Sequence, residues 1–116
     1  MDNKELSLLI AKTIDSKKGQ DIVILDIGAK SSFADYFVIA TASNLRLLSA
    51  LCDEIEDKVA EQGVIVTHIE GKGDSGWILM DFGDIIVNLF TPEQRGHYGI
   101  ERIWRDCAEI EFNPAE

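Results

Sequence analysis

Two glycine motifs in the second half of the chain carry residue types used in phosphate and metal chemistry. Gly71, Gly73 and Gly76 have the spacing G-x-G-x-x-G of dinucleotide sites. Such a site needs its glycine loop between a strand and a helix, because the helix N-terminus holds the pyrophosphate. Here the loop leads into WILMD, an apolar stretch typical of a strand. We therefore interpret it as a loop between antiparallel strands.

The second motif, Asp81-Phe82-Gly83, matches the magnesium-binding D-F-G of protein kinases. A kinase also needs a catalytic lysine and an H-R-D loop between its glycine loop and this motif, over a far longer chain. The motif is better interpreted as a β-turn in which Gly83 takes a positive φ. Asp81 and Asp84 flank that turn, but two carboxylates alone are a poor ligand set for calcium or magnesium.

Other catalytic combinations are equally incomplete. A nucleotidyltransferase holds two metal ions on an aspartate pair on a strand, and the nearest candidate follows Gly28 at Asp35. Phe37 stands where the second carboxylate would be needed. His68 and His97 have no serine or cysteine close in sequence to activate. We therefore expect no catalytic residues, no cofactor and no metal.

Apolar periodicity and cap residues predict elements in the order α-β-β-α-β-β-β-α. Helices are predicted over residues 3–17, 44–62 and 92–105, and strands over residues 22–27, 36–42, 64–69, 77–80 and 84–90. Ser43 or Asn44 is expected to cap the second helix. Thr91 is expected to cap the last helix, which Gly96 and Gly99 should interrupt.

This order favours one α/β domain over residues 1–116, a small mixed β-sheet of about five strands with flanking helices. The strands at 36–42 and 64–69 are joined by a helix and are expected to be parallel, whereas strands joined by tight turns should be antiparallel. The folded core should span about residues 3–106, followed by a loose C-terminal tail.

The net charge of the chain indicates which kinds of surface it can bind. The chain has 21 acidic and 11 basic residues among 116, a net charge of −10. That balance argues against binding nucleic acid mainly through phosphate neutralisation and suits a partner with a basic surface. The alternative is that the acidity serves only solubility.

No apolar run approaches the length of a membrane span, and the N-terminal MDNKELSLLI resembles no targeting peptide. Cys52 and Cys107 lack partners at metal-ligand spacing and are interpreted as buried, reduced thiols. We expect a cytoplasmic protein.

Residue types typical of interface anchors follow the two glycine motifs. Trp77 begins a predicted strand, and Arg95, Tyr98, Glu101 and Trp104 occur in the last helical segment. Trp, Tyr and Arg dominate interface hot spots, because each combines a large area with a polar group. Helical spacing favours packing of Trp104 on the sheet. For Trp77 and Tyr98 the pattern is compatible with either a core or an interface position.

The chain resembles a known family along most of its length, from about Leu6 to Trp104. The motifs that carry the resemblance are D-Y-F-V-I-A-T, the hairpin W-x-L-x-D-x-G-D and the segment R-x-x-Y-x-x-E-x-x-W. Together they resemble the ribosomal silencing factors, also called Iojap-related proteins. The resemblance implies a nucleotidyltransferase-like sandwich without catalytic carboxylates, in agreement with Phe37. The chain departs from the family pattern at Asn88, where histidine is frequent, and at Gly96 and Gly99.

The resemblance also implies a function that is not enzymatic. Members of the family bind the large ribosomal subunit at large-subunit ribosomal protein fourteen (uL14), on the joining face, and block association with the small subunit. Such a translational repressor lowers protein synthesis under nutrient limitation, as in stationary phase. The expected partner is ribosomal protein, with little direct nucleic-acid contact. The alternative is a small nucleotidyltransferase-like enzyme.

Within this chain we expect the docking residues to come from the hairpin and the last helix. They are Trp77, Met80, Asp81, Asn88, Arg95, Tyr98 and Glu101. The sequence leaves open whether the same apolar patch also forms a homodimer away from the ribosome.

Overall fold

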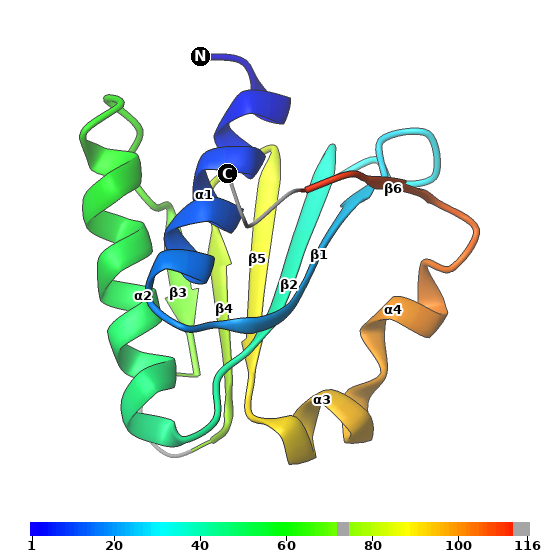
Figure 1. Cartoon of the computed structure of the whole chain (residues 1–116). Helices are drawn as coiled ribbons and strands as arrows, with labels where there is room; N and C mark the ends of the chain where they lie inside the picture. The colour runs from blue at the N-terminus through cyan, green and yellow to red at the C-terminus, as the bar shows by residue number, and fades with distance from the viewer. Residues whose placement is uncertain (72–74, 113–116) are drawn as a thin grey trace.

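The computed structural model describes residues 1–71 and 75–112, and within them the chain forms four helices and six strands (Figure 1). The helices are α1 (Asn3–Ser16), α2 (Leu45–Ala60), α3 (Pro92–Tyr98) and α4 (Ile100–Ile103). The strands are β1 (Gln20–Asp26), β2 (Tyr36–Thr41), β3 (His68–Glu70), β4 (Trp77–Asp81), β5 (Ile85–Phe90) and β6 (Ala108–Ile110). The predicted order is confirmed, except that β6 lies in the stretch predicted to be a loose tail.

The strands form one mixed sheet in the order β3-β4-β5-β2-β1-β6. β2 and β5 form a parallel pair at its centre, with Tyr36 opposite Ile85, and the remaining neighbours are antiparallel. β2 and β3 run in the same direction, as expected, but β4 and β5 lie between them. β6 extends the other edge, where Ile110 lies opposite Ile24.

Side-chain caps fix where the two long helices begin. Asp2 accepts a hydrogen bond from the backbone N–H of Glu5 at 2.8 Å, and the Glu5 carboxylate accepts one from Asp2 in return, which completes a capping box. At α2, Asn44 is the capping residue, with its Oδ1 accepting from Leu47 N–H at 2.8 Å. Thr91 precedes α3 as predicted, but its side chain forms no capping hydrogen bond, so that part of the prediction is wrong.

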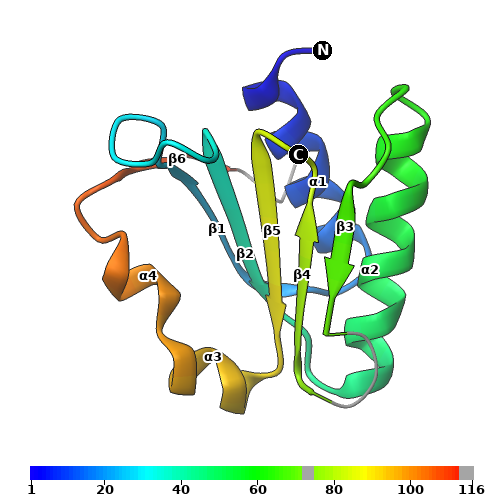
Figure 2. The same ribbon diagram turned by 180° about the vertical axis from the view of Figure 1, so that it is seen from behind.

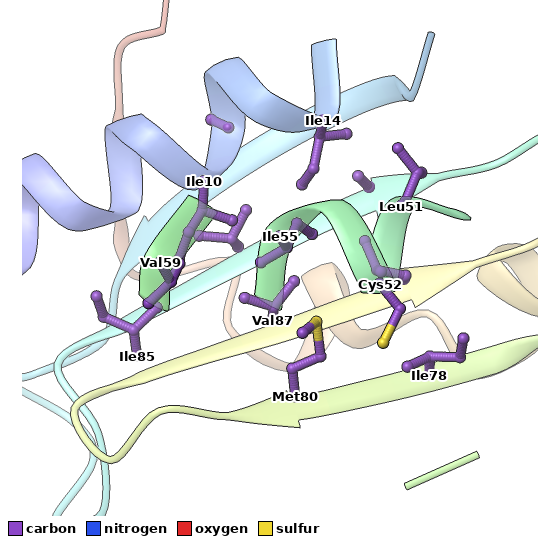
Figure 3. Close-up of a cluster of buried hydrophobic side chains, with 14 of the residues drawn as sticks. Ile10, Ile14, Leu51, Cys52, Ile55, Val59, Ile78, Met80, Ile85 and Val87 are labelled. Atoms are coloured by element: carbon purple, nitrogen blue, oxygen red, sulfur yellow. The ribbon is translucent and has the colours of Figure 1, made fainter. Parts of the chain in front are cut away.

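The main core lies between the sheet and the two long helices. α1 and α2 pack side by side on the same face of the sheet (Figures 1 and 2). Figure 3 shows their apolar side chains, including Ile10 and Ile55, above the inward-facing residues of β4 and β5. The α2 stripe predicted from its spacing is confirmed as buried. It consists of Leu48, Leu51, Cys52, Ile55 and Val59.

The second face of the sheet carries a smaller apolar cluster, against which residues of the α3–α4 segment pack (Figure 2). α3 continues through Gly96, contrary to the predicted break there, and ends at Tyr98, with Gly99 as its C-cap residue. Gly99 has φ 54°, and a Cβ built on it would lie 2.2 Å from the Arg102 guanidinium. The left-handed backbone of this turn therefore favours glycine, while the Arg102 side chain is flexible and could move away from a Cβ.

Candidate docking surface

Trp77 is held from two sides on the second face of the sheet. It lies opposite Phe90 across the β4–β5 pair, and the two rings stack with centroids 5.3 Å apart. Its indole Nε1–H donates to Asn88 Oδ1 at 3.1 Å. Asn88 is itself buried, so its amide completes a hydrogen bond inside the protein. The indole is therefore fixed in one orientation while it stays partly exposed.

Tyr98, the last residue of α3, reaches across to Trp77. The two ring centroids are 4.4 Å apart with the planes inclined by 47°. Tyr98 remains 44% exposed. An anchored indole beside a partly exposed phenol ring combines large apolar area with few mobile bonds, which is the composition of an interface hot spot.

Arg95 makes internal contacts that hold the α3–α4 segment. Its Nε and Nη2 donate to the two carboxylate oxygens of Glu101 at 3.1 and 3.0 Å. Its Nη1 donates to Thr41 Oγ1 at 2.9 Å and to the backbone carbonyl of Asp21. The Arg95 side chain is only 12% exposed. One guanidinium thus links both short helices to the ends of β1 and β2.

The ion pair changes the acidity of Glu101. Hydrogen bonds from Arg95 lower the pKa of this carboxyl below its usual value, against a smaller opposing effect of burial. The carboxylate is therefore ionised at neutral pH. Arg95 and Glu101, both predicted to contact a partner, pair with each other within the α3–α4 segment, and their contact with a partner stays a prediction.

A second aromatic group lies beside β2. Phe37 and Trp104 meet edge to face at 5.3 Å, and Phe33 lies 6.1 Å from Trp104. Phe33 is 56% exposed and Ile103 is 72% exposed. The predicted packing of Trp104 against the sheet is confirmed.

An open, mainly apolar hollow joins the two aromatic groups. It is lined by Phe33, Phe37, Trp77, Leu79, Ile86, Asn88, Tyr98, Ile100, Ile103 and Trp104. We give the name aromatic face to six of its accessible members: Phe33, Trp77, Leu79, Tyr98, Ile103 and Trp104. Contiguous apolar surface of this kind marks interaction sites in soluble proteins.

Sequence reasoning missed Phe33, Leu79 and Ile103. Alternation along the hairpin could have identified Leu79, since residues 77, 79 and 81 share one side of a strand. Phe33 stands in a loop and Ile103 in a single helical turn, where no periodicity indicates direction.

The structure corrects two of the predicted docking residues. Met80 is fully buried and points from β4 into the core beneath α2 (Figure 3), because strand alternation turns it away from Trp77. Asn88 is buried on the side of Trp77 and supports the indole. Asp81 lies at the end of β4, where its Oδ1 accepts from Gly83 N–H at 2.8 Å.

The two glycine motifs form connections between strands. Gly71 follows β3 and Gly76 precedes β4, its antiparallel neighbour, while Gly73 lies outside the described residues. Gly83, at φ 91°, turns the chain from β4 to β5 as predicted. Phe37 packs in the apolar cluster, so no carboxylate accompanies Asp35 at that position.

A group of polar side chains lies at the N-terminal end of β2. The Asn3 amide donates to Asp35 Oδ2 at 3.3 Å and to Asp84 Oδ2 at 3.2 Å. Burial and the nearby carboxylates, Asp26 first among them, raise the pKa of Tyr36. Among the described residues, no three His, Cys, Asp or Glu side chains converge as a metal site. Within the same residues, no helix has the length and apolar character needed to cross a membrane.

Comparison with known proteins identifies the family. A family model described as "Ribosomal silencing factor during starvation" matches residues 1–116. The chain belongs to this family. It is 33% identical over 114 residues to the ribosomal silencing factor RsfS of Bacillus subtilis, covering 97% of each chain. It is 36% identical over 103 residues to RsfS of Zymomonas mobilis, covering 89% of this chain and 77% of the relative.

Solved structures agree with the fold. A crystal structure of a Chromobacterium violaceum protein matches with a TM-score of 0.87 at 30% identity, over 100% of both chains. One from Bacillus halodurans matches with a TM-score of 0.83 at 29% identity, over 95% of this chain and 100% of the other. The predicted family and α/β class are confirmed. The family is named for a ribosomal factor and not for an enzyme, in agreement with the prediction.

Proposed function

We propose that this protein binds the large ribosomal subunit through the aromatic face and sterically prevents the small subunit from joining. The observation that carries the proposal is the pre-oriented Trp77–Tyr98 pair, held by Asn88 and Phe90 beside a contiguous apolar hollow. A partner that covers this hollow gains apolar burial without having to order the anchors first.

The charge of the chain supports a protein contact over an RNA contact. At −10, the chain is repelled by the phosphates that dominate a ribosomal surface and attracted by a basic ribosomal protein. By resemblance to the family, that protein is large-subunit ribosomal protein fourteen on the joining face. The site of action is then the cytoplasm, and the result is lower protein synthesis when nutrients are limiting.

Steric blocking of subunit joining needs no catalysed reaction, only a bound protein large enough to occupy the joining face. The molecule measures about 33 × 32 × 30 Å, a body much thicker than any gap that two packed macromolecular surfaces leave between them. Bound at the joining face, it excludes the small subunit.

The test is an order-of-addition experiment on sucrose gradients. The protein is mixed with large subunits before small subunits are added, and joined particles are measured. We expect fewer joined particles than without the protein, and a weaker effect when it is added after joining. Undiminished joining, with the protein absent from the large-subunit fraction, would refute the proposal.

The same apolar face supports a homodimer in the absence of ribosomes. Pairing of two copies would cover the hollow symmetrically. Light scattering after gel filtration gives the mass directly, and a dimer should dissociate when large subunits are added. A monomer at all concentrations would exclude this part of the proposal.

A further inference from the structure

A small pocket adjoins the aromatic face at the β3 edge of the sheet. It has a volume of about 180 Å³ and is lined by Glu70, Gly71, Ser75, Trp77, Leu79 and Tyr98. It has room for the end of one long side chain and none for a folded segment.

Hydrogen bonds join Ser75 to Gly71 and Trp77, and all three residues line the pocket. Ser75 Oγ donates to the Gly71 carbonyl at 2.7 Å and accepts from Trp77 N–H at 3.3 Å. A Cβ built on Gly71 would lie 1.9 Å from the Trp77 carbonyl oxygen, so only glycine allows this close approach. These contacts hold the described walls of the pocket in place.

Strand register places a carboxylate beside the aromatic walls. Glu70 on β3 lies opposite Leu79 on β4, so both side chains point to the side of the sheet that carries Trp77. The Glu70 carboxylate is 68% exposed, and His68 Nε2 contacts one of its oxygens, Oε1, at 2.8 Å. The contact involves Oε1, one of the two carboxylate oxygens.

We propose that this pocket receives one basic side chain, a lysine or an arginine, from the ribosomal partner. A cation is attracted by the faces of Trp and Tyr rings, here Trp77 and Tyr98, and by the carboxylate of Glu70. The apolar stem of the same side chain packs against Leu79 while its charged end reaches Glu70. The inference rests on the proposed function and identifies the chemistry of one contact within it.

The first test compares two charge-neutralising variants in binding to purified large ribosomal subunits. Glu70→Gln removes the carboxylate charge at the pocket. Glu61→Gln makes the same change at the end of α2, which covers the opposite face of the sheet, where the Glu61 carboxylate lies 3.9 Å from Lys58 Nζ. Both positions are exposed, so neither change should disturb folding.

We expect Glu70→Gln to weaken binding roughly fivefold at low salt, and its affinity to fall less steeply as salt is raised. Glu61→Gln should behave as wild type. Equal affinity and equal salt dependence in Glu70→Gln and Glu61→Gln would overturn the pocket assignment, even if subunit binding itself is confirmed.

The second test needs no ribosome. Nα-acetylarginine amide is titrated into the free protein while the two indole N–H signals are followed by NMR, with Nα-acetylnorleucine amide as the uncharged control. The arginine derivative should shift the Trp77 signal more than the Trp104 signal, and Glu70→Gln should reduce that shift. No shift, or the same shift from the norleucine derivative, would overturn the inference. Arginine binding without subunit binding would leave the pocket standing and refute the proposed function.

Discussion

At the scale of single residues, the proposed docking anchor is a small assembly from three elements. β4 supplies Trp77, β5 supplies Asn88 and Phe90, and α3 supplies Tyr98. Sequence reasoning identified Trp77 and Tyr98 by residue type. It could not separate a residue that contacts a partner from one that orients the contact, because Asn88 is polar in either role.

Asn88 and Trp77 should be energetically coupled. Asn88→Ala leaves a part-buried indole N–H without its acceptor, which should destabilise the fold by about 1–3 kcal/mol. Trp77→Phe removes the donor, so Asn88→Ala in that background should cost less. Urea unfolding of both single variants and the double variant measures the coupling. Strictly additive effects would show that the hydrogen bond contributes nothing.

Tyr98 should act through its ring. Because the side chain is 44% exposed, Tyr98→Ala should leave the fold intact and weaken binding to large subunits by roughly 2 kcal/mol. Tyr98→Phe keeps the ring and should bind almost as wild type. Sedimentation with large subunits compares the two variants. If folded Tyr98→Ala sediments like wild type, the anchor is misplaced.

At the scale of elements, the α3–α4 segment depends on one ion pair. It consists of two short helices that lack a long stripe of their own, and short helices owe their stability to tertiary contacts. Arg95 supplies such contacts to both helices and to the ends of β1 and β2. The segment that carries Tyr98 should therefore loosen before the sheet does.

The contribution of the Arg95–Glu101 ion pair to stability should decrease at acid pH. The Glu101 pKa is lowered in the folded protein, so its contribution is complete above the ordinary value of 4.5 and is lost as pH falls through the lowered pKa. Glu101→Gln should therefore be less stable than wild type at pH 7, with a difference that shrinks below about pH 4.5. Thermal unfolding between pH 7 and pH 3 measures it. A difference independent of pH would contradict the assignment.

Elements with strong periodicity were predictable and short ones were not. α1 and α2 present long apolar stripes, and the strands 36–41 and 85–90 are rich in β-branched residues. β6 spans three residues, of which only Ile110 is apolar and larger than alanine, so the sequence contains too little pattern to reveal it. The predicted strand 64–69 is reduced to 68–70, because only these residues pair with β4.

At the scale of the whole molecule, the two faces of the sheet are covered differently. α1 and α2 cover one face and build the main core, while the other carries the exposed aromatic groups. The candidate site as a surface was therefore beyond sequence reasoning. Its residues come from positions 33, 77, 79, 98, 103 and 104, which only the folded chain brings together.

A matched pair of isoleucines tests which side of the molecule docks. Ile103 on the aromatic face is 72% exposed, and Ile65, between α2 and β3, is 73% exposed and does not line the hollow. Ile103→Glu places a charge within the proposed contact and should weaken large-subunit binding at least tenfold. Ile65→Glu adds the same charge elsewhere and should bind as wild type. An equal loss of binding in both variants would show that the added charge weakens binding wherever it is placed, and would contradict docking through the aromatic face.

The central strand pair has a consequence for how the chain is made. β2 is complete at residue 41, but its parallel neighbour β5 begins only at residue 85. Pairings between distant segments are slow to form and require both segments to be present. During synthesis, β2 therefore cannot pair with β5 until α2, β3 and β4 have also left the ribosome. Until then, its apolar residues lack their final neighbour. This protein should complete its sheet only when most of it has left the ribosome that made it, and only then could it silence another.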